Sequence, residues 1–258
     1  MQNAVPNASQ NQLRKWARLA EAKFRREDGL FLAEGVKVVE ELLKSDWQIE
    51  AILVLPEKNL YWDQLIAPVK DKFSIFQLTR SDWKKLSQDK EPEGLIAIVK
   101  SKKQPSPSSF LKSANGHVLM LHEINNPGNL GALMRSAYWF GFAGILLSPN
   151  SVDCTNPKVI RTAMGSVFHL TVLSDVDLCA LFPEIKRDYL LIGSDVRQGV
   201  SPCPLTKKAA LLLGSESHGL PDDLLTQVNV RWRIPGGSQS DSLSLPQAAA
   251  IMMYEMSK

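Results

Sequence analysis

Apolar positions along the first hundred residues switch repeatedly between helical and strand-like spacing. Between Ser9 and Arg26 they recur every three or four residues with basic side chains between them, which predicts an amphipathic helix ended by Gly29. Short apolar runs predict strands at 30–33, 51–55, 73–78 and 95–99. Helices are predicted at 36–44, 60–67 and 81–86. Strands that alternate with helices over about 100 residues indicate a small α/β domain.

This pattern is interrupted after residue 100. Residues 100–112 read K-S-K-K-Q-P-S-P-S-S-F-L-K, with two prolines, four serines and no acidic residue. Proline and serine keep a chain extended and solvated, so we predict a linker over 101–113 whose lysines can lie beside phosphate. The linker would separate a first domain, 1–100, from a second, 114–258.

The second domain begins with His117–Leu121, which is apolar after its first residue, as expected of a strand buried on both faces. Further buried strands are predicted at 144–147, 189–192 and 209–213. Helices are predicted at 130–140, 158–164, 175–181, 222–227 and 246–256. This order again predicts α/β structure, with a largely parallel sheet.

Composition excludes several classes of protein. With 44% hydrophobic and 22% charged residues, the chain is neither disordered nor fibrous. Its longest apolar stretches fall far short of the ~20 residues of a membrane span, and residues 1–12 lack the apolar core of a secretory signal. Cys154, Cys179 and Cys203 form no C-x-x-C pair, which indicates reduced thiols in a cytoplasmic protein and no zinc site.

Charge is distributed unevenly along the chain. The formal net charge is +3, but residues 1–113 hold 19 Lys+Arg against 15 Asp+Glu, whereas residues 114–258 hold 11 against 12. Residues 12–26 contain six basic side chains and a single acid, Glu21. Such a segment is typical of a polyanion-binding surface. The alternative is the solvated face of an amphipathic helix.

Three polar, glycine-containing loops each follow an apolar run, at the strand ends where open α/β sheets bind ligands. The first covers Asn125–Gly131 and leads to Arg135. Asn and Gly concentrate where the backbone takes unusual dihedral angles. Asn129 at the helix start can cap the helix while Arg135 projects from its second turn. The alternative is an ordinary Asn-capped helix with a surface arginine.

The second loop, Gly214–Gly219, places two glycines around Glu216 directly after a run of leucines. Gly214 would let a ligand approach the backbone, with Glu216 at the mouth of the site. The Walker lysine and the G-x-G-x-x-G spacing are both missing, so a phosphate-binding loop is excluded. His218 has no ligand-type neighbour, and none of the four histidines has metal spacing to another.

The third loop, Ile234–Pro246, is polar and glycine-rich and runs into the terminal apolar helix. Such a loop can wrap a small ligand with backbone groups. The alternative is a flexible connection capped by Ser242 or Ser244. A G-x-S-x-G nucleophile elbow is missing from the sequence, and no Ser-His-Asp arrangement is compelling.

Taken in this order, the loops resemble the three motifs of the SpoU/TrmH family of RNA ribose 2′-O-methyltransferases. The first family motif, N-P-x-N-x-G-x-x-x-R, corresponds to Asn126–Arg135, and the second, G-x-E-x-x-G, to Gly214–Gly219. The third begins with Ile234-Pro235 and ends with Ser242-Leu243-Ser244 before the apolar helix. Ser244 departs from the family, which usually has Asn at this position; serine keeps a hydroxyl but loses the reach of the amide.

The resemblance covers residues 117–256 closely, and Phe31–Gly35 looks like the F-x-x-E-G of the family's L30e-like substrate-binding domain. It implies an α/β SPOUT methyltransferase domain with a C-terminal trefoil knot, preceded by the small L30e-like domain. It also implies a homodimer whose active site draws on both subunits, and the terminal apolar helix fits such an interface or a simple buried position. S-adenosylmethionine would lie against Gly214, Ile234 and Leu243.

The resemblance implies roles for polar residues as well. Arg135 would bind the RNA phosphate and stabilise the developing alkoxide. Asn129 would orient Arg135 or the ribose, and Glu216 would hold Arg135 or another polar partner. Ser242 and Ser244 would fix the substrate loop.

The basic half of the chain would hold the RNA, and ribosomal RNA is favoured over transfer RNA. Its phosphate contacts would come from Arg14, Lys15, Arg18, Arg25, Arg26, Lys102 and Lys103. An RNA-binding or ribosome-assembly factor that kept the fold but lost turnover is the main alternative, and Ser244 favours it. A base methyltransferase of the same superfamily is disfavoured by the first motif.

Overall fold

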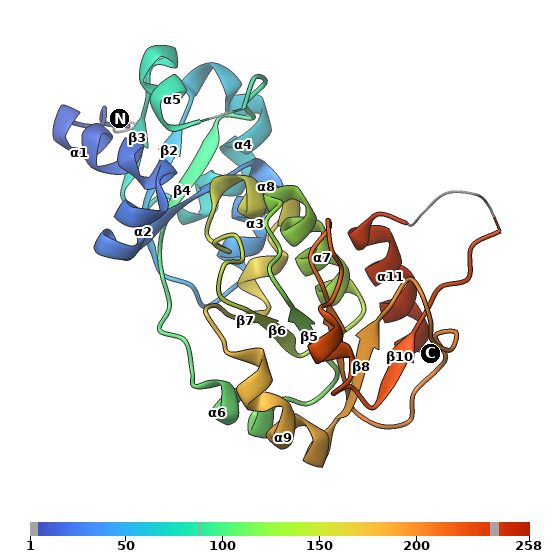
Figure 1. The fold of residues 1–258 in the computed structure, drawn as a ribbon. Helices are drawn as coiled ribbons and strands as arrows, with labels where there is room; N and C mark the ends of the chain where they lie inside the picture. The colour runs from blue at the N-terminus through green and yellow to red at the C-terminus, as the bar shows by residue number, and fades with distance from the viewer. Residues whose placement is uncertain (1–4, 88, 238–242) are drawn as a thin grey trace. The chain divides into compact units, whose positions relative to one another are not determined.

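The chain forms two compact units (Figure 1). The computed structural model describes residues 5–87, 89–237 and 243–258. Unit 1 comprises residues 1–103 together with 155–168, and unit 2 comprises residues 104–154 and 169–258. The first break therefore falls within the predicted linker, whereas the return of 155–168 to unit 1 was not predicted.

Unit 1 is built on a four-stranded sheet in the order β1-β4-β2-β3. β4 (Leu95–Lys100) is antiparallel to both of its neighbours, β1 (Leu30–Glu34) and β2 (Ile49–Val54), and β2 is parallel to β3 (Ile75–Gln77). All four predicted strands are confirmed. The apolar runs of β1, β2 and β4 are largely buried, whereas the three residues of β3 are half-buried. Helices of this unit are α3 (Val36–Leu43), α4 (Asn59–Ile66), α5 (Arg80–Leu86) and α8 (Pro157–Ala163).

The single helix predicted at the N-terminus is divided in the structure. Glu21 is extended (φ −96°, ψ 135°) and separates two helices. A helix end leaves carbonyl groups without intrahelical donors, and the guanidinium of Arg25 donates to those of Leu19 and Ala20, at 3.0 and 2.9 Å. The segments are α1 (Gln10–Ala17), the 3₁₀ turn Arg18–Ala20 and α2 (Ala22–Asp28).

The linker prediction is wrong in its second half, where helix α6 (Pro107–Ser113) forms. The hydroxyl of Ser106 accepts from the N–H of Ser109 at 3.2 Å, and Pro107 occupies the first helical position. Serine and proline here start a helix instead of keeping the chain extended. Phe110 and Leu111 then become buried in unit 2.

Unit 2 contains a six-stranded sheet in the order β10-β8-β9-β5-β6-β7, parallel throughout. Four strands were predicted. β7 and β10 were not, because three residues carry too little periodicity to be recognised. The strands are β5 (Val118–Leu121), β6 (Gly144–Leu147), β7 (Thr171–Leu173), β8 (Leu190–Ser194), β9 (Ala209–Leu213) and β10 (Val230–Trp232).

Helices cover both faces of this sheet. Val118 and Met120 of β5 share one core with side chains of α6, α9 (Leu178–Asp188) and α10 (Asp222–Leu225). Elsewhere in the unit, α7 (Pro127–Trp139) packs against α11 (Leu245–Met256) (Figure 1). Among the described residues, no helix is long and apolar enough to cross a membrane, and no group of three His, Cys, Asp or Glu is placed to hold a metal.

Candidate active site

The first two motif loops meet at the carboxyl edge of the unit 2 sheet. β5 lies between β6 and β9, so Leu121 is level with both Leu147 and Leu213. From β5 the chain goes to β6 and β7 on one side, whereas β9, β8 and β10 lie on the other. The reversal of strand order between β5 and β9 is a topological switch point, where open α/β sheets bind ligands.

Asn126, and not Asn129, caps helix α7. Its side-chain oxygen accepts from the N–H groups of Gly128 at 2.8 Å and Asn129 at 3.3 Å, and Pro127 fills the first helical position. The capping role expected for Asn129 is therefore wrong. Because the cap is supplied by Asn126, the amide of Asn129 in the first turn is available for a contact outside its own helix.

That contact joins the first and second motifs. Nδ2 of Asn129 donates to Oε1 of Glu216 at 3.0 Å across the switch point. A carboxylate only accepts hydrogen bonds, so the bond requires the NH₂ group of Asn129 to face Glu216. Oδ1 of Asn129 then remains as an acceptor, and no donor to it is seen among the described residues. The sequence predicted a polar partner for Glu216; the structure supplies Asn129 in that place and does not bring Arg135 to it.

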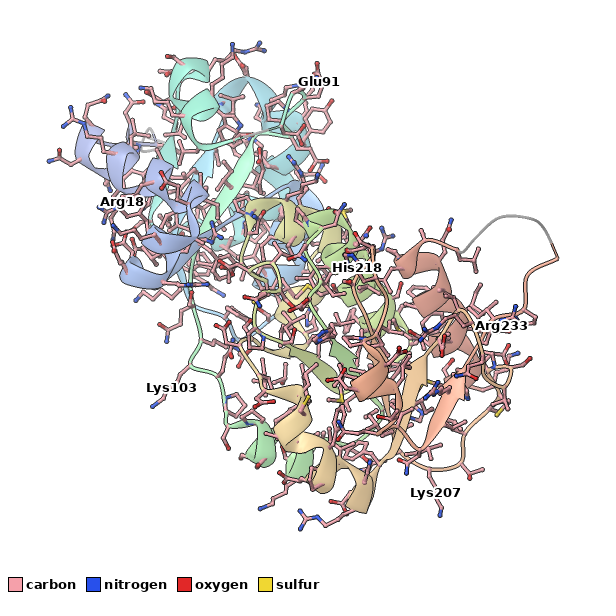
Figure 2. All side chains as sticks on the ribbon, in the orientation of Figure 1. Arg18, Glu91, Lys103, Lys207, His218 and Arg233 are labelled. Atoms are coloured by element: carbon pink, nitrogen blue, oxygen red, sulfur yellow. The ribbon has the colours of Figure 1, made fainter. Side chains whose placement is uncertain are left out.

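The second motif loop folds back tightly on itself. A Cβ on Gly214 would stand 2.1 Å from the carbonyl carbon of Gly219, a distance that no side chain can occupy. Gly219 has a φ of +68°, and its N–H donates to the carbonyl of Ser215 at 2.9 Å. Both glycines of G-x-E-x-x-G are thus required by the loop's own backbone, and the close approach expected of a ligand at Gly214 is made by Gly219 instead. Glu216 and His218, which Figure 2 labels, are both exposed on this loop.

Arg135 lies on the exposed side of α7, and no polar partner is seen for it within the described part of the chain. Tyr138 and Trp139, three and four positions further on, share this face because of the helical repeat. Their side chains are 46% and 83% exposed. Arg135, which the first motif predicts as catalytic, therefore projects from the same face as two exposed aromatic side chains. Exposed aromatic side chains next to one another are typical of an interaction surface.

The third motif is described only in part. Ser242 lies outside the described residues. Ile234 is half-buried, and Leu243 is 47% exposed. Ser244 precedes α11 without capping it, and its hydroxyl donates to Oε1 of Gln247 at 3.0 Å.

Sequence reasoning missed a polar cluster at the same edge, in the loops that follow β5 and β6. Glu123 and Asn150 both have positive φ (53° and 63°), a conformation that non-glycine residues seldom adopt. Nδ2 of Asn150 lies 3.4 Å from Oε1 of Glu123, and the buried Ser148 hydroxyl accepts from the N–H of Glu123 at 2.8 Å. Strained backbone at a ligand-binding edge is typical of functional loops, but nothing in a single sequence signals it.

The basic residues predicted to hold RNA occupy three kinds of environment. The prediction that Arg25 binds RNA is wrong. Arg25 is only 3% exposed, and it donates to main-chain carbonyls and, at 3.1 Å, to Oγ1 of Thr155, so it is not available to phosphate. Ion pairs engage three more: Lys15–Glu50 at 3.2 Å, Arg18–Asp28 at 2.9 Å and Lys102–Asp46. Exposed and without a described charged partner are Arg14, Arg26 and Lys103.

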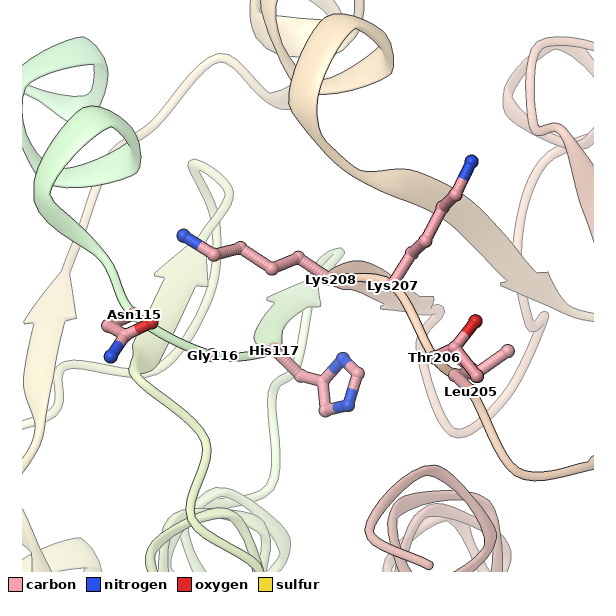
Figure 3. A pocket seen from close by; sticks show the side chains of 7 residues that line it. All are labelled: Asn115, Gly116, His117, Leu205, Thr206, Lys207 and Lys208. Atoms are coloured by element: carbon pink, nitrogen blue, oxygen red, sulfur yellow. The ribbon is translucent and has the colours of Figure 1, made fainter.

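A shallow pocket lies at the opposite, amino edge of the sheet (Figure 3). His117 lines it, and its Nδ1 accepts from the N–H of Ala209 at 3.0 Å while Nε2 faces the carbonyl of Met256 at 3.2 Å. Burial lowers the pKa of His117, although the hydrogen bond to Met256 opposes the shift. The neighbouring Lys208 is bound to the carbonyl of Ala114 at 2.6 Å. Both side chains are thus engaged by main-chain groups, which favours a structural role for them.

Comparison with known proteins identifies the family. The sequence matches the SpoU rRNA Methylase family over residues 116–254, and the MRM3-like substrate binding domain over residues 10–97. The chain belongs to the SpoU rRNA methylase family. The resemblance drawn from the three loops is confirmed, and so are the expected enzyme class, an S-adenosylmethionine-dependent RNA 2′-O-methyltransferase, and its cofactor.

Relatives in sequence extend over nearly the whole chain. A Bacillus subtilis protein named 23S rRNA (guanosine(2553)-2′-O)-methyltransferase RlmP is 27% identical over 98% of this chain and 98% of its own. The human mitochondrial rRNA methyltransferase 3 is 28% identical over 76% of this chain, which corresponds to 46% of that protein.

Solved structures confirm the expected SPOUT α/β fold. A TrmH-family RNA methyltransferase from Porphyromonas gingivalis aligns over 96% of this chain and 97% of its own, with a TM-score of 0.79 and 26% identity. The SpoU methyltransferase AviRb from Streptomyces viridochromogenes, solved with AdoMet, aligns over the same shares with a TM-score of 0.82 and 21% identity.

Proposed function

We propose that this SpoU-family enzyme acts on ribosomal RNA, methylating a ribose 2′-hydroxyl at the edge where β5 and β9 meet. The observation that carries the proposal is the Asn129–Glu216 hydrogen bond, which ties two family motifs together at the switch point of the sheet. The names of the B. subtilis and human relatives both specify ribosomal RNA. These names support ribosomal over transfer RNA.

Gly214, Ile234 and Leu243 are the residues that would hold S-adenosylmethionine. Leu243 offers an exposed apolar side chain, and a Cβ on Gly236 or Gly237 would meet no atom of the described residues within 4 Å. Apolar side chains beside accessible backbone suit a ligand with an aromatic base and polar edges. When bound, the cofactor supplies a methyl group already activated by its sulfonium.

The polar residues would orient and activate the ribose. A hydroxyl is a poor nucleophile, so the site must align it and stabilise the negative charge that develops on its oxygen. The guanidinium of Arg135 keeps its charge and offers five N–H donors, which suits it to hold the neighbouring phosphate and the alkoxide. Asn129, fixed by Glu216, presents Oδ1 to the incoming hydroxyl.

Arg135 would reach this site in a homodimer. It shares its helix face with Tyr138 and Trp139, and α11, which packs on α7, exposes Ile251 and Tyr254. An exposed apolar patch of this kind marks an interaction surface. We place a second copy of the chain on this patch, so that Arg135 of one subunit acts beside Asn129 of the other.

The C-terminal segment would be threaded as a trefoil knot. Support comes from the order of the last strands: β8 enters between β9 and β10, and the chain then returns from β10 to α11 beside α7. A crystal structure that traces residues 233–245 decides whether this segment passes through the loop that precedes β9.

We also place the enzyme in the cytoplasm, where Cys179 and Cys203, both exposed and free, would stay reduced.

Transfer of labelled methyl groups tests the proposal. Wild-type protein should methylate unmodified ribosomal RNA in preference to transfer RNA. Arg135→Ala should lower the rate by about a hundredfold or more, because it removes charge stabilisation of the transition state, while the Kd for S-adenosylmethionine stays within about twofold. Arg135→Lys keeps the charge but loses the planar fork and should recover little of the rate. Full activity in the alanine variant removes Arg135 from the mechanism.

A factor that binds RNA without turnover is the second candidate. The observation that favours it is the hydroxyl of Ser244, which stands where the family usually has Asn and is engaged by Gln247. If this candidate is correct, the wild-type protein binds cofactor and ribosomal RNA but transfers no methyl group, and Ser244→Asn restores transfer.

A further inference from the structure

The segment after β8, residues 195–200, contributes to the carboxyl edge between the loops that carry the second and third motifs. It lies there because β8 stands between β9 and β10 in the sheet. Two of its side chains, Val196 and Val200, are apolar and 68% and 57% exposed. The three motifs assign this segment no role.

Backbone hydrogen bonds attach the segment to β10. The N–H of Asp195 donates to the carbonyl of Trp232 at 2.9 Å, and the N–H of Val200 donates to that of Arg231 at 3.0 Å. In return the N–H of Arg233 donates to the carbonyl of Val200 at 2.9 Å. Residues 195–200 and 231–233 are therefore held as one body, directly before Ile234 of the third motif.

Side-chain contacts tighten the same attachment. Nε of Arg233, which Figure 2 labels, donates to the carbonyl of Val196 at 3.0 Å. Gly199 has a φ of +148°, and a Cβ at this position would stand 2.6 Å from the carbonyl oxygen of Arg231. So close an approach leaves little freedom for β10 to shift relative to the segment.

Asp195 is the charged group at the centre of this body. Its side chain is only 2% exposed. Oδ1 accepts from the N–H of Arg197 at 2.8 Å, and Oδ2 lies 3.5 Å from Nη1 of Arg231, whose Nε donates to the carbonyl of Leu225 at 3.1 Å. Burying a carboxylate is costly unless it is paired, and removing its partner leaves an uncompensated charge. Nε of Arg197 also pairs with Oδ1, at 3.4 Å, but that side chain is 58% exposed. Arg231 is 25% exposed and is the partner that joins Asp195 to β10.

We infer that Asp195 is a positioning residue for the cofactor site: through its ion pair with Arg231 it fixes the direction in which the chain enters Ile234 and the place of Val196. The inference rests on the proposed function, since it assigns S-adenosylmethionine to this edge. Asp195 acts through strand β10 and touches neither the cofactor nor the reacting atoms. Its effect is therefore on cofactor affinity.

The test compares Asp195→Ala and Asp195→Asn with wild type, by calorimetric Kd for S-adenosylmethionine and by kcat at saturating cofactor. Asp195→Ala leaves the guanidinium of Arg231 without its buried carboxylate, and the shift of residues 231–234 that follows should raise the Kd at least tenfold. In Asp195→Asn the amide oxygen can still accept from the N–H of Arg197, but the negative charge that pairs with Arg231 is lost. This variant should raise the Kd by a smaller factor than Asp195→Ala. In both variants kcat at saturation should stay within about threefold of wild type.

Asp222→Ala is the matched control, because Asp222 also binds Arg197, at 2.5 Å, but is exposed and forms no ion pair with Arg231 among the described residues. It should leave the Kd within about twofold of wild type. If the Asp195 variants lose thermal stability while their Kd matches that of the control, Asp195 is merely structural and the inference is overturned. If wild-type protein binds no S-adenosylmethionine, the proposed function itself fails.

Discussion

Asn129 and Glu216 show at the residue scale how two short motifs become one site. Asn126 takes over the helix cap, which frees the amide of Asn129 for the carboxylate that the folded-back loop presents. The sequence could identify all of these residues as site candidates, because Asn, Gly and Glu cluster after apolar runs. The sequence could not show that Asn129 pairs with Glu216. Asn129 lies six positions from Arg135 but 87 positions from Glu216, and only the folded sheet brings the loops after β5 and β9 together.

Substitutions of this pair should not be additive. Asn129→Ala and Glu216→Ala should each lower kcat/KM by roughly ten- to a hundredfold, and the double variant should be little worse than either, with a coupling energy of about 1–3 kcal/mol. Ser217→Ala, next to Glu216 on the same loop, is the control and should be near wild type. Fully additive losses would show that the two side chains act independently.

His117 should make unit 2 sensitive to acid. Its Nδ1 accepts a backbone N–H, so the folded state favours the neutral ring and burial lowers the pKa from 6.5. The unfolded chain binds a proton as the pH falls through 6.5 while the folded chain does not, so stability is full above this pH and is lost below it. His117→Gln should remove this loss, which amounts to at most about 1.4 kcal/mol per pH unit. Denaturant unfolding of both proteins from about pH 7.5 to 5.5 measures it; parallel curves would contradict the assignment.

At the scale of elements, strong apolar runs were predicted well and weak ones were not. β5 and β9 are four- and five-residue strands buried at every position, and such runs have few alternatives to a central strand. β7 and β10 have only three residues each, and tertiary pairing decides their conformation. α6 was mistaken for extended chain because serine and proline serve both a linker and a helix start.

Residues 155–168 are the element whose place could not be predicted. They lie between β6 and β7 in sequence yet belong to unit 1, where Arg25 binds Thr155 and the indole N–H of Trp47 donates to the carbonyl of Phe168 at 3.2 Å. These partners are more than a hundred positions apart, and no local pattern records such contacts.

Thr155→Val should destabilise unit 1. Valine keeps the shape but removes the hydroxyl that accepts from the buried Arg25, and a buried charged donor without that acceptor costs about 1–3 kcal/mol. Thr162→Val is the control: its hydroxyl donates to the carbonyl of Lys158 in its own helix, and its loss should cost less than about 0.5 kcal/mol. The free energy of unfolding in denaturant decides, and equal effects would count against the role of Thr155.

At the scale of the whole molecule, fewer basic side chains of the first half are available to phosphate than the sequence count suggests. Arg25 is buried, and Lys15, Arg18 and Lys102 are paired with acids, which leaves Arg14, Arg26 and Lys103 of the predicted set for phosphate. Charge can be counted along a sequence, but pairing depends on which acids the fold brings near.

Replacing Arg14, Arg26 and Lys103 by alanine should weaken RNA binding and flatten its salt dependence. Each phosphate contact removed lowers the slope of log K against log salt by about 0.7–0.9. The control replaces Lys15 and Arg18, whose charges are already balanced by Glu50 and Asp28. Fluorescence anisotropy over a salt series should show a clearly larger change for the first set. Equal changes would place the RNA elsewhere on the protein.

The proposed activity of the edge between β5 and β9 is delivery of a methyl group to a ribose oxygen. Its most direct test is the identity of the methylated atom: ribosomal RNA is treated with the wild-type protein and S-adenosylmethionine, then hydrolysed in alkali and analysed by mass spectrometry. A ribose 2′-O-methyl group blocks cleavage of the adjacent phosphodiester, so we expect an alkali-resistant dinucleotide carrying the methyl group, which should be missing when Arg135→Ala is used. A methyl group found on a base, or no methylated product from wild-type protein, would contradict it.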